Sequence, residues 1–233
     1  MIADGGRRRS TEAFFGRRRG KRVRPLQAAA LQAGLDRYRL DIGLPPPGRL
    51  EDLFEAAVSE VRLEIGFGGG EHLVNEAVRH RWTGFLGVEP FVNSMAKMMA
   101  ALADLPLPNL RVYDDDATRL LDWLPAASLS GIDLLYPDPW PKKKHWKRRF
   151  VNPANLQRFG RVLKRGGSLR FASDIPSYVN WTLLACAAHG GFEWLARDSA
   201  DWHTPFEGWE GTRYEAKALR EGRCPAYLTF ARA

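Results

Sequence analysis

The chain has 233 residues, of which 45% are hydrophobic, and its formal net charge is +8. This length suffices for one large α/β domain with a substantial core. No apolar run approaches the roughly 18 residues of a membrane-spanning helix, and the arginine-rich start lacks the apolar region of a secretory signal. The two cysteines, Cys186 and Cys224, lack metal-ligand spacing, so we expect a cytoplasmic protein with no metal and no membrane partner.

Two short segments hold the positive charge. Residues 7–24 contain nine Lys/Arg and one acid, and residues 142–149 contain six Lys/Arg and no acid, so the rest of the chain has a net charge of −6. Because Lys and Arg supply most of the sequence-independent affinity for phosphate backbones, this distribution favours a nucleic-acid partner. A solubility tail and a solvated loop are the alternative interpretation.

In chain order, residues 1–24 are predicted to form a basic, disordered arm. Residues 25–49 follow as a short helix and a Pro-rich linker, and residues 50–233 form the compact domain. Within this domain, helical segments alternate with apolar, strand-like segments. The helical segments are residues 51–60, 71–81, 91–105, 118–124, 154–167 and 176–191. The strand-like segments are residues 61–70, which run into a glycine loop, and 82–90, 109–117, 131–140, 168–174, 192–199 and 225–233.

This alternation predicts an α/β fold with a mostly parallel, doubly wound sheet. We expect the last two strands to pair antiparallel at the edge, because no convincing crossover helix joins them. In such sheets, ligands bind outside the carboxyl ends of the strands. Five acids follow predicted strands and should share this rim: Glu64, Glu89, Asp116, Asp138 and Asp174.

The first glycine loop, LEIGFGGGEHL, narrows the choice of cofactor. A dinucleotide fingerprint needs a third glycine where Glu71 stands, and that carboxylate would repel a pyrophosphate. No Gly-Lys-Ser/Thr of a P-loop follows either. The remaining pattern, an acid followed by Gly66, Gly68 and Gly70, suits a positively charged cofactor without phosphate, and S-adenosylmethionine has both properties.

Each candidate cofactor residue has an expected role. Gly66 and Gly68 would let the backbone approach the cofactor closely. Glu64 would receive its amino group, directly or through water, and Glu89 would accept both ribose hydroxyls. Asp116 lies where adenine usually binds, with the two preceding aspartates as alternatives. A simple turn and solvated strand ends would also account for these residues one by one, but their combination favours a methyltransferase.

Five motifs carry a resemblance to a known family: EIGFGGGEHL, GVEPF, YPDPWPKKKHWKRRFVNP, LRFASDIPSY and TRYEAKAL. In this order and spacing, they resemble the bacterial tRNA (guanine-N7-)-methyltransferases from about Phe15 to the C-terminus. The resemblance implies a Rossmann-like class I S-adenosylmethionine-dependent methyltransferase fold, with a mostly parallel seven-stranded sheet and an antiparallel edge strand. It also implies S-adenosylmethionine as donor and guanine at position 46 of tRNA as acceptor.

The resemblance assigns roles to single residues. Asp138 is implied to be catalytic and, with Glu64, Glu89 and Asp116, to contact the cofactor. The residues implied to bind substrate are Lys142, Asp174, Thr212, Arg213, Tyr214 and Glu215. The last four read Thr-Arg-Tyr-Glu where the family commonly has Thr-Lys-Phe-Glu, so the charge is kept and the ring gains a hydroxyl.

Asp138 is the one acid in residues 136–150 and lies between two prolines. Since N7 of guanine is unprotonated at neutral pH, methyl transfer to it needs alignment rather than a general base. A carboxylate can stabilise the developing positive charge or accept hydrogen bonds from N1–H and the 2-amino group. We therefore expect Asp138 to recognise the base while neighbouring basic residues hold the RNA backbone. These residues are Lys143, Lys144, Lys147, Arg148 and Arg149.

Two other readings of the sequence stay open. The protein could methylate another RNA or a protein acceptor, or it could be a non-catalytic RNA-binding protein on the same fold. Whether the chain is a monomer or a homodimer does not follow from the sequence.

Overall fold

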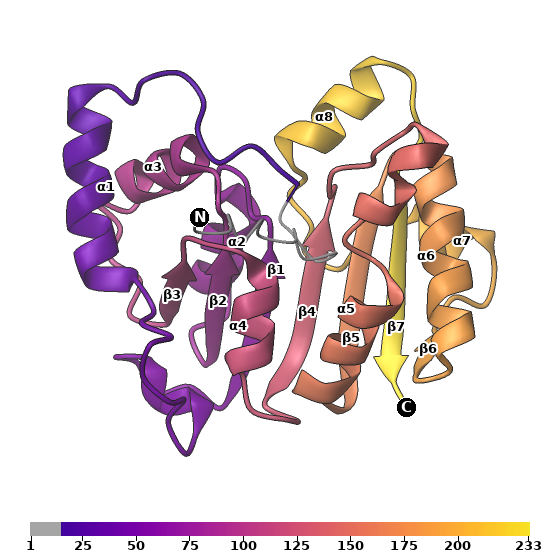
Figure 1. Ribbon diagram of the computed structural model, residues 1–233, viewed down its shortest axis with the longest axis horizontal. Coiled ribbons are helices and arrows are strands. Elements are labelled where there is room, and N and C mark those ends of the chain that lie inside the picture. Colours follow the sequence, from indigo (N-terminus) through magenta and orange to yellow (C-terminus); the bar gives the residue numbers. More distant parts are fainter. Residues whose placement is uncertain (1–14) are drawn as a thin grey trace, which may run out of the picture.

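The computed structural model describes residues 15–233, so the first part of the predicted arm lies outside the described residues. Seven strands form one sheet in the order β3-β2-β1-β4-β5-β7-β6 (Figure 1). Strand β7 runs antiparallel to both of its neighbours, and the other pairs are parallel. The strands are β1 (Glu60–Ile65), β2 (Thr83–Val88), β3 (Leu110–Tyr113), β4 (Leu129–Leu135), β5 (Leu163–Ser173), β6 (Phe192–Trp194) and β7 (Ala226–Arg232).

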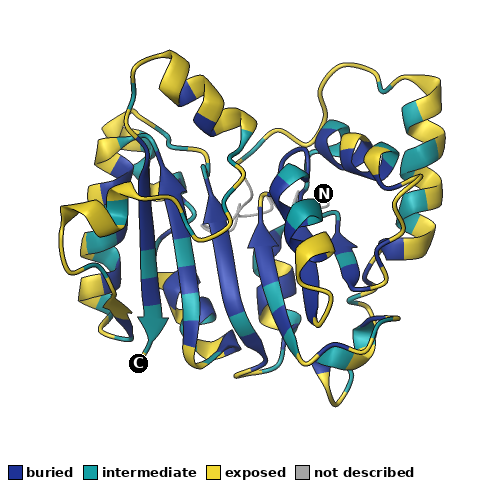
Figure 2. Ribbon diagram, turned by 180° about the vertical axis from the view of Figure 1, so that it is seen from behind, coloured by how far each residue is buried: buried dark blue, intermediate teal, exposed yellow. Residues whose placement is uncertain are grey.

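Helices cover both faces of the sheet. The core on one face is formed with α4, α5 and α6, and the core on the other face with α1, α2 and α3. The central strands are consequently buried over most of their length (Figure 2), and all six residues of β2 are buried. The α-helices are α1 (Pro25–Tyr38), α2 (Glu71–Arg79), α3 (Val92–Ala101), α4 (Ala117–Trp123), α5 (Pro153–Val162), α6 (Pro176–His189), α7 (Ser199–His203) and α8 (Arg213–Arg220). The 3-10 helices are η1 (Leu50–Leu53) and η2 (Lys143–Arg148).

The prediction of a helix at residues 51–60 is wrong. Only the short helix η1 forms there, and the chain then runs irregularly to β1. The ring of Phe54 fills the space beside Gly84 in β2, where a Cβ would lie only 2.4 Å from a ring carbon. This packing, together with the burial of Leu50 and Val58, holds the segment against the core in place of a helix.

The predicted helix at residues 154–167 also ends early. Helix α5 stops at Val162, and residues 163–167 are the first part of β5. Leu163 is buried and pairs with Leu129 of β4. Strand β5 therefore begins before the glycines at 166 and 167, which were expected to end the helix.

Residues 15–24 belong to the predicted arm, and part of this segment contacts the start of α3. The carbonyl of Arg18 accepts a hydrogen bond from the backbone N–H of Val92 (3.0 Å). The Asn93 side chain accepts from the N–H of Gly20 (2.8 Å) and donates to the carbonyl of Lys21 (2.7 Å). The division of the chain at residues 24 and 49 stays a prediction.

Both cysteines are free thiols. Cys186 is buried within α6, where burial raises the pKa of its thiol to about 12. Cys224 is exposed just before β7. Among the described helices, none is long and apolar enough to cross a membrane.

Candidate active site

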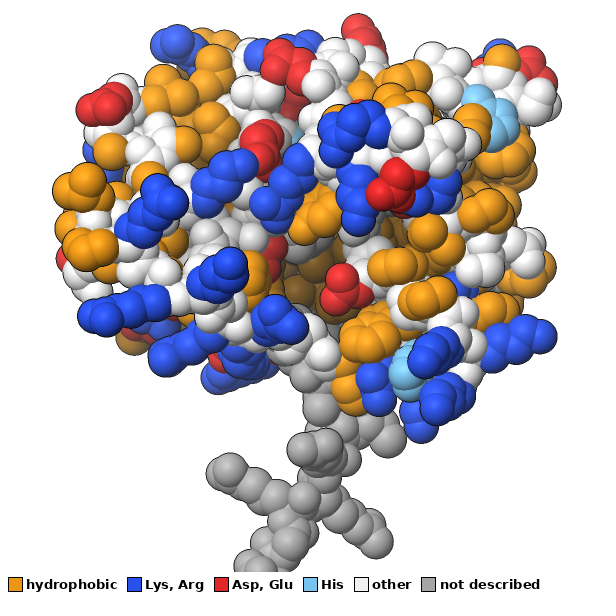
Figure 3. Space-filling view, turned by 90° about the horizontal axis from the view of Figure 1, so that it is seen from above, with side chains coloured by type: hydrophobic (Ala, Val, Ile, Leu, Met, Phe, Trp, Pro, Cys, Tyr) orange, Lys and Arg blue, Asp and Glu red, His pale blue; other side chains and the backbone are white. Residues whose placement is uncertain are grey.

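A cavity of about 490 Å³ opens at the carboxyl ends of the parallel strands. This volume is in the range of small-molecule sites. Figure 3 shows it as a hollow with an acidic side chain at its mouth and Lys and Arg side chains gathered on either side. Among the predicted site residues, those lining it are Gly66, Glu89, Asp116, Asp138, Lys147, Arg148, Arg149 and Tyr214.

The glycine loop between β1 and α2 forms one wall. Gly66 adopts φ +75°, and no atom lies within 4 Å of the position that a Cβ would occupy, so its backbone faces open space. Gly68 adopts φ +58° but does not line the cavity. A Cβ there would lie 3.4 Å from the guanidinium of Arg213 and 3.5 Å from the ring of Tyr214. Gly66 therefore leaves room for a ligand, whereas Gly68 lets α8 pack on the loop.

Glu89 and Asp116 lie at the ends of the next two strands, and both line the cavity. Glu89 is buried and accepts backbone hydrogen bonds from Gly68 (2.8 Å) and Phe91 (2.9 Å). Its pKa is raised by burial, which outweighs these two hydrogen bonds. Asp116 caps α4 by accepting from the N–H of Thr118 (3.0 Å). Each carboxylate is thus fixed by backbone groups and retains lone pairs for a ligand.

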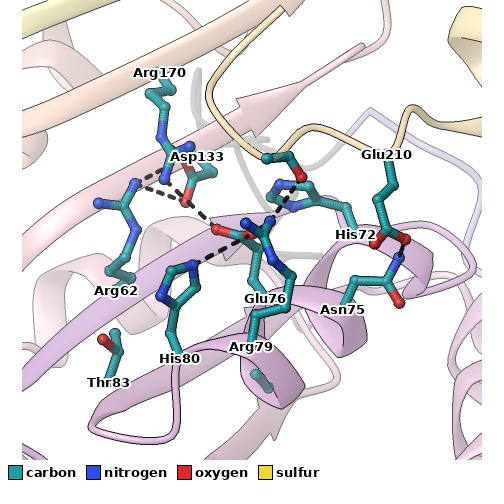
Figure 4. Close-up of polar contacts among 12 residues, drawn as sticks. Arg62, His72, Asn75, Glu76, Arg79, His80, Thr83, Asp133, Arg170 and Glu210 are labelled. Carbon is teal, nitrogen blue, oxygen red and sulfur yellow. Dashed lines mark hydrogen bonds and ion pairs between the residues drawn. The ribbon is translucent and has the colours of Figure 1, made fainter.

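Glu64 lies apart from these residues. It is buried below the glycine loop, does not line the cavity, and accepts a hydrogen bond from Nδ1 of His72 (2.7 Å). Burial lowers the pKa of His72, but Glu64, with smaller contributions from Asp133 and Glu76, outweighs that effect and the pKa is raised overall. The centroids of the His72 and Trp209 rings are 5.0 Å apart. His72 belongs to a group of charged and polar side chains between α2 and the sheet, which includes Arg62, Glu76, Asp133 and Arg170; we call this group the charged layer under α2 (Figure 4).

The loop after β4 carries Asp138 to the mouth of the cavity. Among the described residues, none forms a hydrogen bond or an ion pair with its carboxylate. The pKa of Asp138 is raised because the surrounding loop removes it partly from water. Tyr136 (φ +50°) and Trp140 (φ +45°) bracket the Pro-Asp-Pro segment, and each precedes a proline. Bulky residues before proline strongly prefer extended backbone, so these two conformations cost about 1–3 kcal/mol each.

The predicted substrate residues divide into two groups. Tyr214 lines the cavity, with Arg213 stacked on its ring (4.8 Å to the centroid), and Lys142 is exposed at the start of η2. The other three are engaged inside the protein. Thr212 and Glu215 form the capping box of α8. Asp174 lies outside the cavity lining and accepts from Arg223 (2.5 Å).

The basic run is not uniform, and the prediction that Arg149 contacts the RNA backbone is wrong. Lys143, Lys144 and Lys147 are exposed. Arg148 stacks between the rings of Trp140 (4.9 Å) and Phe15 (5.1 Å). Arg149 is fully buried, and its guanidinium donates to oxygens of Pro139 and Ser177.

One part of this site was not predicted from the sequence. Phe15, Gly16 and Arg17 also line the cavity, although their segment was predicted to be disordered. The pair of phenylalanines in a run of arginines was the available signal, since an arm that stays in water has no need of aromatic residues.

The sheet order with antiparallel β7, the glycine loop and the acids at the strand ends define a class I S-adenosylmethionine-dependent methyltransferase. The open space in front of Gly66 and the acidic rim fit this cofactor, which has a cationic centre and no phosphate. Solved structures of the same class share the fold. The 16S rRNA methyltransferase KamB superposes with a TM-score of 0.53 at 17% identity, covering 79% of this chain and 93% of that chain. The aminoglycoside resistance methyltransferase NpmB1 gives 0.52 at 16% identity, covering 79% and 92%.

Sequence comparison identifies the family. Residues 59–226 match the family described as "Putative methyltransferase". The tRNA (guanine-N(7)-)-methyltransferase of Mesorhizobium japonicum is 73% identical over 224 residues, 96% of each chain. That of Brucella melitensis is 60% identical over 232 residues, the full length of both. The chain belongs to the tRNA (guanine-N(7)-)-methyltransferase family, as the motifs predicted.

Proposed function

We propose that this protein transfers the methyl group of S-adenosylmethionine to N7 of guanine at position 46 of tRNA, with Asp138 as the catalytic residue. Family membership supports the reaction. The observation that carries the assignment of Asp138 is its carboxylate, which has no described partner and lies at the mouth of the cofactor cavity beside the basic run.

Three residues are proposed to hold the cofactor directly. The backbone at Gly66 lets the cofactor approach the loop, Glu89 accepts the ribose hydroxyls, and Asp116 lies on the adenine side. When bound, S-adenosylmethionine supplies an electrophilic methyl group on a sulfonium centre. Glu64 is proposed to act through His72, by fixing the glycine loop from below.

Asp138 is proposed to act on the guanine. An ionised carboxylate at the cavity mouth can accept hydrogen bonds from N1–H and the 2-amino group, a pair of donors that adenine lacks. The same carboxylate stabilises the positive charge that develops on the purine. Since nothing among the described residues competes for its oxygens, both interactions are available to the substrate.

The surface around the cavity is proposed to bind tRNA. Lys143, Lys144 and Lys147 are exposed on η2 and would neutralise backbone phosphates. Lys142 and Arg148 extend this surface to the cavity mouth, and Lys and Arg side chains also gather across the hollow in Figure 3.

The segment after residue 211 is proposed to complete the guanine site. Arg213 and Tyr214 would contact the target nucleotide, because Tyr214 lines the cavity. Thr212 and Glu215 would position them through the capping box of α8, and Asp174 would act through Arg223. We place the reaction in the cytoplasm, in keeping with the two free thiols.

The experiment that tests the function is methyl transfer from labelled S-adenosylmethionine to tRNA transcripts that carry guanine or adenine at position 46. Borohydride and aniline cleavage then maps the modified base. We expect label in the guanine transcript alone, with cleavage at that position. Label that is insensitive to the exchange would retain a methyltransferase with another acceptor site. No label on any RNA, despite measurable cofactor binding, would favour a protein acceptor or a binding function.

A further inference from the structure

Arg149 is the largest fully buried side chain in residues 15–233, with a relative exposure of 0%. Its guanidinium donates three hydrogen bonds. Nε donates to the carbonyl of Pro139 (3.0 Å), Nη1 to the carbonyl of Ser177 (2.8 Å), and Nη2 to Oγ of Ser177 (3.0 Å). Arg149 thus connects the loop that carries Asp138 to the first turn of α6.

Aromatic rings surround this guanidinium. Its central carbon lies 4.5 Å from the ring centroid of Trp146, 4.7 Å from that of Tyr178 and 5.6 Å from that of Trp181. No carboxylate within the described residues forms an ion pair with Arg149. The charge is therefore held by ring faces and neutral oxygens, and these three rings form the cage to which we refer below.

The cage is itself anchored to neighbouring backbone. The indole N–H of Trp181 donates to the carbonyl of Val151 (2.7 Å), and the hydroxyl of Tyr178 accepts from the N–H of Val151 (3.2 Å). The indole of Trp146 donates to the carbonyl of Pro141 (3.3 Å). The Asp138 loop is thus held at two carbonyl groups, that of Pro139 by the guanidinium and that of Pro141 by the cage.

The loop requires such support because its backbone is strained at both ends. Tyr136 and Trp140 both have positive φ and both precede a proline. A loop free to relax would move these residues toward extended backbone and displace the carboxylate between them. Asp138 cannot hold its own position, since it has no hydrogen bond to a described residue.

We propose that Arg149 is a positioning residue for Asp138: its guanidinium, held in the cage, fixes the Pro139 carbonyl and thereby keeps the strained Pro-Asp-Pro loop in the conformation that presents the carboxylate to guanine. This inference rests on the proposed function of Asp138. It assigns to one arginine of the basic run a task inside the protein, whereas its exposed neighbours act on the tRNA.

The test compares Arg149→Met with two matched controls. The first control replaces Lys143, Lys144 and Lys147 together by Ala. The second is Arg161→Met, because Arg161 also donates to backbone carbonyls, those of Leu121 and Leu124 at the end of α4, but lies outside the cavity lining. For each variant, the measurements are kcat, KM for tRNA, tRNA binding at several salt concentrations, and thermal unfolding.

For Arg149→Met we expect kcat to fall about 10²-fold, as for a reacting group misplaced by about 1 Å. The affinity for tRNA and its salt dependence should stay those of the wild type. The triple lysine variant should show the opposite pattern, with weaker and less salt-dependent binding. Arg161→Met should retain wild-type kcat. A kcat within threefold of the wild type, or a loss of tRNA affinity and salt dependence like that of the lysine variant, would overturn the proposal.

A rescue experiment separates positioning from folding. In Arg149→Ala, methylguanidinium added at millimolar concentration can enter the cage and donate to the same oxygens, so it should restore kcat. Arg149→Lys, which keeps the charge with a single donor group, should have an intermediate kcat. Absence of rescue in folded Arg149→Ala would overturn the proposal. If the wild type itself fails to methylate guanine at position 46, the proposed function is wrong. That outcome is distinct from an Arg149 variant with unchanged kcat, which overturns only the positioning role.

Discussion

Two aspartates five positions apart on the same strand and loop have opposite surroundings. Asp133 in β4 is buried and binds Arg62 (2.9 Å) and Arg170 (2.8 Å) in the charged layer under α2 (Figure 4). Burial alone would raise its pKa, but the two guanidinium groups, together with His72, outweigh burial and the pKa is lowered. Asp138 is exposed and has no such partner, and its pKa is raised because the loop removes the carboxylate partly from water.

This contrast separates an acid that serves the fold from one that we propose serves the reaction. Asp133 holds β1, β4 and β5 together through the charges on either side of it. Asp138 has no partner among the described residues, which leaves its oxygens to the substrate, and its raised pKa means that its ionised form slightly disfavours the folded state. The following predictions are tests of this division.

The largest effect should come from Asp133→Asn. Removing the central member of this buried ionic group leaves Arg62 without an acidic partner and Arg170 with Glu76 alone (3.8 Å), so the free energy of unfolding should fall by about 3–5 kcal/mol. Urea denaturation measures it. The control is Asp122→Asn, whose exposed carboxylate binds Arg158, and which should cost less than about 1 kcal/mol. Equal losses in the two variants would contradict a structural role specific to Asp133.

Asp138→Asn should leave the fold intact and lower kcat by about 10²–10³-fold, the usual loss when one preorganised electrostatic group is removed. The amide keeps the shape but loses the charge, and it cannot accept from both donors of guanine. Single-turnover methyl transfer measures the chemical step. Filter binding should give wild-type tRNA affinity, and unchanged turnover would remove Asp138 from catalysis.

On acidification, the effects of the two aspartates should appear at different pH values. The ionised Asp133 contributes stability above its unfolded pKa, and that stability is lost only as the pH falls through its lowered folded pKa. The carboxylate of Asp138 is protonated at a higher pH than an ordinary aspartate. We therefore expect an acid range in which the protein is folded but slow. The checks are the pH profile of kcat/KM and far-UV circular dichroism, and coincident loss of both signals would contradict the expectation.

The smallest effect should be a gain in stability. Because the folded-state pKa of Asp138 is raised, its ionised form disfavours the folded state above that pKa. Asp138→Asn should thus raise Tm slightly at neutral pH and leave it unchanged at a pH where the wild-type carboxyl group is protonated. A lower Tm at neutral pH would indicate that Asp138 has a stabilising partner.

The sequence predicted those features that local patterns decide. The alternation of strands and helices predicted the sheet, and position after a strand predicted that Glu89, Asp116 and Asp138 share a rim. The prediction that Glu64 contacts the cofactor did not allow for the alternation of side chains along β1. Glu64 and Arg62 point toward α2, whereas Val61 and Leu63 point into the core on the other face of the sheet.

Arg149 could not be distinguished from its neighbours by composition, since residues 142–149 look uniformly basic. The difference comes from the end of η2, where the chain turns back toward α6 and Arg149 follows the helix as its C-cap. There Arg149 packs on the ring of Trp146, and Lys143, Lys144 and Lys147 remain in water. Such a division depends on tertiary contacts with Tyr178 and Trp181, which lie about thirty residues away in the chain.

The antiparallel strand β7 has a consequence for synthesis on the ribosome. It is the last strand in the sequence, yet it lies between β5 and β6. Until residues 226–232 emerge, the nascent chain presents β5 as an open edge with unpaired N–H and C=O groups. The domain can collapse around β1 to β4 early, but its sheet closes only at the end of translation, and that interval is when premature pairing with other chains is the greatest hazard.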